Sequence, residues 1–82
     1  MKDTKALVRR YIEEDILMGG GTAFADGDSL IEHRVVDSTG FLELIAYLED
    51  EFGLTVDDDE MVPENLGSLD RIETYVRRKL AA

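Results

Sequence analysis

The chain of 82 residues contains no cysteine, so neither a disulfide nor a thiolate zinc site can reinforce it. It also has no apolar run long enough for a signal peptide or a membrane span, and no internal repeat. We therefore expect a cytoplasmic protein that forms one domain over residues 1–82. At this length the core is small, which predicts a thin margin of stability.

Basic residues are also scarce. Nine lysines and arginines stand against nineteen aspartates and glutamates, which gives a net charge of −10. Twelve of the acids lie between Asp26 and Glu60, a stretch in which Arg34 is the one base. Such a field repels nucleic acid and anionic membranes and attracts basic protein surfaces. We expect basic protein partners, and the alternative interpretation is a surface that only keeps the protein soluble.

Apolar residues at helical spacing predict two long helices. The first runs from about Asp3 to Met18 and is ended by Gly19-Gly20-Gly21. The second begins at Ser38 and is ended by Gly53. The buried stripe predicted for the first helix is Leu7, Val8, Tyr11 and Ile12, and that of the second is Phe41, Leu44, Ile45, Leu48 and Phe52.

The connection between these helices, residues 19–36, has no sustained period and is long for a compact domain. Its own apolar residues must therefore hold it against the core. Ser29 to Glu32 also matches a capping box, which predicts a short helical turn inside the loop. The residues expected to face the core are Phe24, Leu30, Ile31, Val35 and Val36.

After Gly53 the chain has a short extended link, Leu54-Thr55-Val56, and then a run of acids that can cap a short helix. Pro63 and Gly67 confine that helix to a turn or two. Ser68 can cap the last helix, whose predicted stripe is Leu69, Ile72, Val76 and Leu80. No strand pattern competes. The predicted fold is all-α, a small four-helix bundle of three main helices plus a short third helix, with a long loop between helices 1 and 2.

The most distinctive stretch is Asp37-Ser38-Thr39-Gly40, at the start of the second long helix. The N-terminus of a helix favours an anion, so a hydroxyl there is well placed to carry a phosphate. Glu43 and Leu44 follow the serine at five and six residues. In this register the chain resembles the acyl carrier protein family. Residues 48–53 resemble the acidic end of that family's second helix, and residues 63–66 resemble its short third helix.

The resemblance implies that Ser38 carries a covalent 4′-phosphopantetheine, attached by a phosphopantetheinyl transferase. The arm's thiol would hold acyl intermediates as thioesters in fatty-acid, polyketide or related specialised biosynthesis, and the cargo could be partly sheltered between helices. The protein would be a monomeric carrier in lipid metabolism and not an enzyme, with no catalytic residue of its own. Its partners would be the transferase, an acyl- or aminoacyl-loading ligase and acyl-processing enzymes with basic docking surfaces. The residues implied to contact them are Asp37, Thr39, Glu43, Glu49 and Asp50.

The chain departs from the family pattern at three positions. Thr39 replaces the usual leucine after the serine, Val35 replaces a frequent glycine, and Gly40 takes a position that is often acidic. Thr39 and Gly40 are expected where partner enzymes would touch the base of the arm. These departures indicate a specialised carrier rather than the housekeeping fatty-acid carrier.

Several other residues have competing interpretations. Asp28-Ser29-Leu30 spells the family tripeptide, but Arg34 stands five residues after Ser29 and no long helix begins there. His33, the only histidine, has no catalytic or metal-binding constellation around it and is expected to be a loop residue. The acids Asp57, Asp58, Asp59 and Glu60 could bind a divalent ion weakly, although a role in starting a helix is favoured. Tyr11, Tyr47 and Tyr75 are expected at the edge of the core.

Two functional alternatives remain open at this point. One is an aminoacyl or peptidyl carrier, loaded by an adenylating ligase. The other belongs to a different class, an unmodified acidic adaptor that binds a basic protein. Without the resemblance, Ser38 would be an ordinary first-turn residue behind an Asp37 cap.

Overall fold

The computed structural model describes residues 3–18 and 24–81, and within these ranges every element is helical and no strand occurs. Four of the elements are α-helices, of which α3 alone is shorter than seven residues. The elements are α1 (Thr4–Tyr11), the π-helical turn η1 (Ile12–Ile16), α2 (Ser38–Phe52), the 3-10 turn η2 (Asp58–Glu60), α3 (Pro63–Leu66) and α4 (Leu69–Ala81). The all-helical prediction is confirmed for this part of the chain. The predicted stop at Gly19-Gly20-Gly21 lies outside it.

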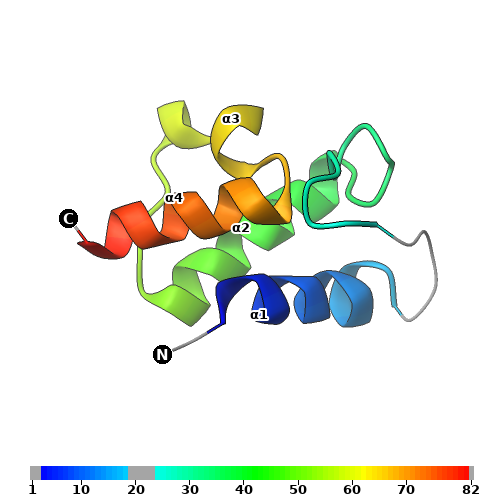
Figure 1. Ribbon diagram of the computed structural model, residues 1–82, viewed down its shortest axis with the longest axis horizontal. Helices are drawn as coiled ribbons and strands as arrows, with labels where there is room; N and C mark the ends of the chain where they lie inside the picture. The colour runs from blue at the N-terminus through cyan, green and yellow to red at the C-terminus, as the bar shows by residue number, and fades with distance from the viewer. Residues whose placement is uncertain (1–2, 19–23, 82) are drawn as a thin grey trace.

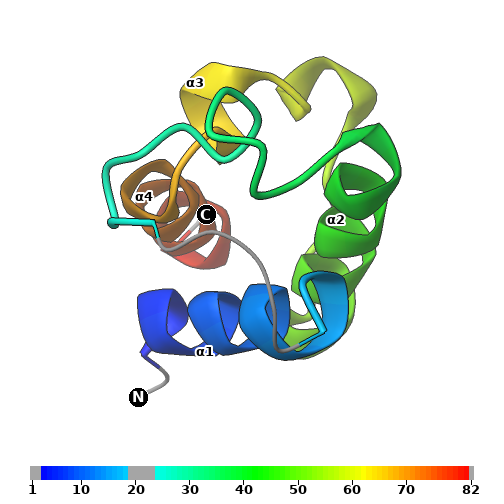
Figure 2. The ribbon, with the colours of Figure 1, turned by 90° about the vertical axis from the view of Figure 1, so that its right-hand side faces the viewer.

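The helices are arranged around one interior. In Figure 1, α4 crosses in front of α2, and α1 runs below α4, level with the C-terminal end of α2. The view in Figure 2 shows α1, α2, α3 and α4 on successive sides of the same centre, and α1 and α3 both contact α4. The radius of gyration is 11.7 Å. A compact domain of this length is expected to have a radius of gyration of about 12 Å. The observed value is therefore that of one small compact domain.

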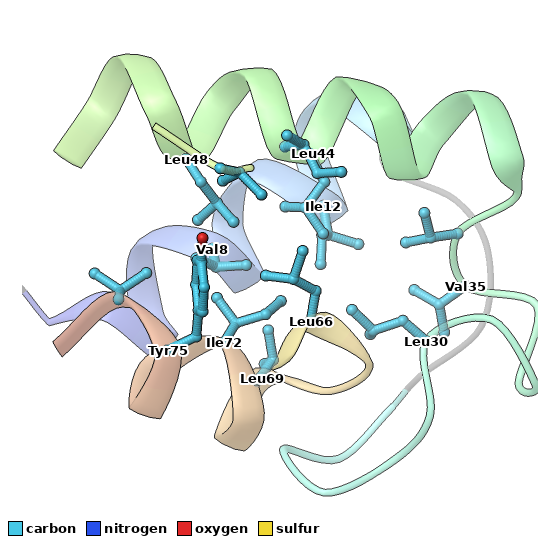
Figure 3. Packing of buried hydrophobic residues seen from close by; sticks show 14 of the residues in the cluster. Val8, Ile12, Leu30, Val35, Leu44, Leu48, Leu66, Leu69, Ile72 and Tyr75 are labelled. Carbon is cyan, nitrogen blue, oxygen red and sulfur yellow. The ribbon is translucent and has the colours of Figure 1, made fainter. Parts of the chain in front are cut away.

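The interior is filled by aliphatic side chains from every helix. In Figure 3 the labelled side chains of α1, α2, α3 and α4 point toward one another, and Leu30 and Val35 of the first loop close one end. Tyr75 is 1 % exposed, so it belongs to the core and not to the core's edge as predicted. The fully buried residues are Val8, Ile12, Leu30, Leu44, Leu48, Leu66, Leu69 and Ile72.

Two side chains and one glycine predicted or available to cap helices do so. Asp3 Oδ1 accepts a hydrogen bond from the Ala6 N–H at 3.2 Å at the start of α1. Ser68 Oγ accepts from the Arg71 N–H at 3.2 Å at the start of α4. Gly53 ends α2 in the left-handed conformation, at φ 65°, which favours glycine because it has no Cβ.

The first helix differs from the continuous α-helix predicted up to Met18. After Tyr11 it widens into the π-helical turn η1, in which the Leu17 N–H donates to the Ile12 carbonyl at 2.8 Å. Single π turns of this kind are uncommon and occur often at functional sites. Here the turn places Ile16 against the first turn of α2.

Two tyrosines lock α1 to α2. The rings of Tyr11 and Tyr47 stack with their centroids 4.1 Å apart. Tyr11 Oη donates to the Glu43 carbonyl of α2 at 3.3 Å, and Tyr47 Oη donates to the Leu7 carbonyl of α1 at 3.3 Å. Each tyrosine therefore binds the backbone of the other's helix.

The first loop is held against the helices largely as expected, with Phe24, Leu30, Val35 and Val36 buried. Ile31 is 48 % exposed, so the prediction that it faces the core is wrong. The reason is that residues 30–34 form a tight turn, in which the N–H of Leu30 donates to the Gly67 carbonyl at 2.8 Å and turns only that side chain inward.

The segment of residues 24–26, the first described part of this loop, is fastened to α1 by Arg9. Its guanidinium lies over the Phe24 ring, 4.4 Å from the centroid, and donates to the Phe24 carbonyl at 2.9 Å. The same group pairs with Asp26 at 2.7 Å, and it holds the pKa of that carboxyl below its usual value. Arg9 therefore ties this segment to α1 through a ring contact, a backbone hydrogen bond and an ion pair.

Two further predictions about the second half of the chain are wrong in detail. The segment between Asp57 and Gly67 forms two short elements, η2 and α3, because Val62 adopts an extended conformation ahead of Pro63. Leu80 is 55 % exposed. In Figure 1 the last turn of α4 extends past the neighbouring helix ends, so the buried stripe of α4 ends at Val76.

Candidate functional site

Ser38 is the first residue of α2, and its side chain is exposed. Asp37 is the N-cap: its Oδ1 accepts a hydrogen bond from the Gly40 N–H at 2.7 Å. The Ser38 hydroxyl has no hydrogen-bond partner among the described residues. The N–H groups of Ser38 and Thr39 also lack an acceptor there, as is usual in the first turn of a helix. A hydroxyl, two backbone donors and the positive end of the helix dipole thus meet at the surface, an arrangement suited to a phosphate ester.

Ser29, the rival serine, is placed differently. It is partly buried, and its Oγ accepts from the Glu32 N–H at 3.2 Å. That bond caps the short turn of residues 30–34, and no helix of useful length follows it. The Ser29 carbonyl also contacts Nδ1 of His33 at 3.1 Å, so His33 takes part in the local turn. The Ser29 hydroxyl therefore already accepts a hydrogen bond, whereas the Ser38 hydroxyl has no partner among the described residues.

A groove of about 370 Å³ lies beside Ser38, between the end of η1 and the start of α2. Asp37 and Thr39, the residues on either side of Ser38, both line it. One wall of the groove is apolar and is formed by Ile16 of η1 and the two residues after it. Arg34 and several carboxylates line part of the remaining surface of the groove. The other lining residues are Asp15, Ile16, Leu17, Met18, Val35, Gly40 and Glu43.

Gly40 is buried, so the expectation that it lies where a partner enzyme would touch the arm is wrong. A Cβ on this glycine would lie 3.3 Å from Ile16 Cγ2 and 3.2 Å from both Val36 Cγ1 and Asp37 Oδ1. Within the first turn of α2, Ser38 and Thr39 lie on the exposed side and Gly40 lies on the side that faces η1. Thr39, by contrast, is exposed beside Ser38, as a partner contact would require.

The acids expected on the outer face of α2 divide into two groups. Glu43 and Asp50 are exposed, as predicted. Glu49 is not free on that face, because its Oε2 accepts a hydrogen bond from the Val56 N–H at 2.9 Å. The left-handed Gly53 turns the chain back and brings that N–H to the carboxylate. Glu49 therefore has a structural role that sequence periodicity could not reveal.

The acidic run Asp57–Glu60 is built around one carboxylate. Glu60 Oε1 accepts from Lys79 Nζ at 2.9 Å, from Tyr75 Oη at 3.0 Å and from the Asp57 N–H at 3.0 Å. The Lys79 bond first, and the Asp57 N–H second, lower the pKa of Glu60 from 4.5 to about 2. Burial raises the pKa of Tyr75. The Oε1 atom of this carboxylate therefore already accepts three hydrogen bonds.

In the described residues no three histidine, aspartate or glutamate side chains are grouped so that they could hold a metal ion. The weak divalent site at Asp57–Glu60 therefore stays a prediction without geometric support. None of the described helices is long and apolar enough to cross a membrane.

The sequence pattern pointed to Ser38 and Asp37 but gave no sign of the groove beside them. Its participants, Met18 and Arg34, are the two non-glycine residues in this part of the chain with positive φ, at 52° and 56°. Helical periodicity carries no signal for such positions. Neither a known protein-family model nor a curated protein matches this sequence.

Proposed function

We propose that this chain is a discrete carrier protein of the acyl carrier type, in which Ser38 bears a covalent 4′-phosphopantetheine. The observation that carries the proposal is the exposed Ser38 hydroxyl, which has no partner in the described residues and stands at the first position of the 15-residue helix α2. The arrangement of the helices around one core supports assignment as a small four-helix bundle of this type. The location expected for such a carrier is cytoplasmic.

The chemistry required of the protein is limited to presenting an oxygen. A transferase would bring coenzyme A, and the Ser38 oxygen would form a bond to the phosphorus next to the pantetheine. The bond between that phosphorus and the bridging pyrophosphate oxygen would break, releasing adenosine bisphosphate, and the serine proton would pass to a base of the transferase. The exposed Thr39 and Glu43 leave room for an enzyme to approach, and the negative field of the central segment would attract a basic one.

After modification, the thiol of the arm would carry an acyl group as a thioester to acyl-processing enzymes in fatty-acid, polyketide or related biosynthesis. An aminoacyl or peptidyl cargo, loaded by an adenylating ligase, would use the same site. Nothing in the geometry of the first turn of α2 separates these two cargoes. An unmodified acidic adaptor is the remaining competitor, and it differs in requiring no reaction at Ser38.

Intact mass spectrometry tests the proposal. The chain, incubated with a broad-range phosphopantetheinyl transferase and coenzyme A, should gain the mass of one phosphopantetheine. The Ser38→Ala variant should gain none, and the Ser29→Ala variant should be modified like the unaltered chain. Ser29→Ala is the matched control because it removes the competing hydroxyl. Modification of Ser38→Ala would refute the site, and an unmodified wild-type chain would leave the acidic adaptor as the better description.

A further inference from the structure

The groove beside Ser38 has the composition of a ligand site. Its volume of about 370 Å³ falls at the lower end of the range of about 300–1,000 Å³ that small-molecule pockets occupy. Ile16, Leu17 and Met18 supply an apolar wall, and Met18 is 83 % exposed. Such sites combine apolar surface with a few polar groups, which here come from Thr39 and the charged residues of the lining.

Arg34 is the only cationic side chain among the described residues that line the groove. It is exposed, and no described carboxylate lies within ion-pairing distance of it, although Asp15, Asp37 and Glu43 line the same groove. Its guanidinium thus keeps its donors for another acceptor. Arginine binds phosphate oxygens well because its planar group can donate two parallel hydrogen bonds.

The interior formed by the described residues is occupied by a cluster of buried hydrophobic side chains. The side chains between α2 and the short helix α3 pack against one another, and Leu44, Leu48 and Leu66 are fully buried there (Figure 3). Entry of a long arm would require these side chains to move apart. The η1–α2 groove is already open to solvent, and the residues on both sides of Ser38 line it.

We propose that the phosphopantetheine arm of the modified chain folds back into the η1–α2 groove, lying over Ile16, Leu17 and Met18 with Arg34 binding its phosphodiester. The inference rests on the proposed function, since it requires an arm on Ser38. It adds a ligand subsite outside the core. Docking removes the apolar part of the arm from water and covers the exposed face of Met18 at the same time.

Methyl NMR spectra of the unmodified and modified chains provide the first test. The methyl signals of Ile16, Leu17 and Met18 should shift on modification, and the signals of Leu48 and Leu66 should stay in place. The mass of each sample is measured first, so that a failed modification is recognised. If the chain gains no arm, the proposed function and this inference fall together.

Thiol reactivity provides the second test. The chain has no cysteine, so the arm's thiol is the sole thiol of the modified protein. Alkylation by a bulky maleimide should be at least about two-fold faster in Met18→Ser than in the wild type, as expected if the arm is docked for half the time or more. Leu80→Ser is the matched control, because Leu80 is also an exposed apolar residue but lies at the end of α4. Its rate should be unchanged.

Two results would overturn the inference while leaving the proposed function intact. In the first, the methyl signals of Ile16, Leu17 and Met18 do not shift on modification, and the thiol of Met18→Ser reacts no faster than that of Leu80→Ser. The other is a set of shifts centred on Leu48 and Leu66, which would place the arm in the interior.

Discussion

Gly40 of α2 lies so close to Ile16 of η1 that a Cβ on the glycine would be 3.3 Å from Ile16 Cγ2. This contact joins the last turn of the first helical segment to the first turn of the helix that carries Ser38. A Cβ at this position would be tightly packed, since Val36 Cγ1 and Asp37 Oδ1 would each lie 3.2 Å from it. A larger side chain at this position would therefore have to displace its neighbours.

The first prediction concerns this contact. Gly40→Asp should lower the free energy of unfolding by about 1–3 kcal/mol, because it overpacks a buried position and places a carboxylate against Ile16. Thr39→Asp introduces the same side chain one residue earlier, at an exposed position. It should change the free energy by no more than about 0.5 kcal/mol. Urea unfolding of both variants measures the difference, and equal effects would show that Gly40 is not constrained by packing.

The second prediction concerns the charge near Ser38. Glu43→Lys should slow modification by the transferase about three-fold or more at low salt, because two opposite unit charges about 6 Å apart contribute about 0.7 kcal/mol in water. The difference should shrink as salt screens the charges. Glu64→Lys carries the same change on α3, where the glutamate is also exposed, and should have a smaller effect on the rate. Equal slowing by the two variants would indicate a dependence on net charge alone.

The third prediction concerns acid stability. The folded pKa of Glu60, about 2, lies below its ordinary value of 4.5. As the pH falls, the unfolded chain takes up this proton first, so the stabilisation is complete above about pH 4.5 and is lost between pH 4.5 and 2. Glu60→Gln should therefore be less stable than the wild type at pH 7 and lose less stability across that window.

Lys79→Met checks the cause of this pH dependence, since the Lys79 hydrogen bond is the largest influence on the Glu60 carboxyl. Its loss of stability between pH 4.5 and 2 should also be smaller than that of the wild type. The double variant should differ little from Glu60→Gln in this window, because the two residues act as one pair. Urea unfolding at several pH values gives the free energy of unfolding as a function of pH. If Glu60→Gln loses as much stability between pH 4.5 and 2 as the wild type does, the loss belongs to other carboxylates.

The elements that sequence patterns predicted best are those with both a cap and a stripe. Asp37 and Gly53 mark the two ends of α2, and Leu44, Leu48 and Phe52 lie on its buried face as their spacing indicates. The local rules for these residues act within four or five positions of the chain. They require no knowledge of what lies across the core.

Predictions failed where a distant residue decides the outcome. Glu49 follows the outward period of α2, but the returning chain brings the Val56 N–H to its carboxylate. Gly40 is buried because η1 widens and places Ile16 against it. Ile31 is apolar like a core residue, yet the turn around Leu30 buries Leu30 and leaves Ile31 exposed. Tertiary contacts of this kind leave no periodic trace in the sequence.

The crossed hydrogen bonds of Tyr11 and Tyr47 also restrict how the molecule can move. Because each hydroxyl is bound to the backbone of the opposite helix, sliding α1 along α2 by a single residue would break both bonds together and separate the stacked rings. The pair acts as a register pin that joins the last turn of α1 to α2. Widening of the groove near Ser38 would then come from the end of η1 swinging about this pin, while the two helices keep their alignment.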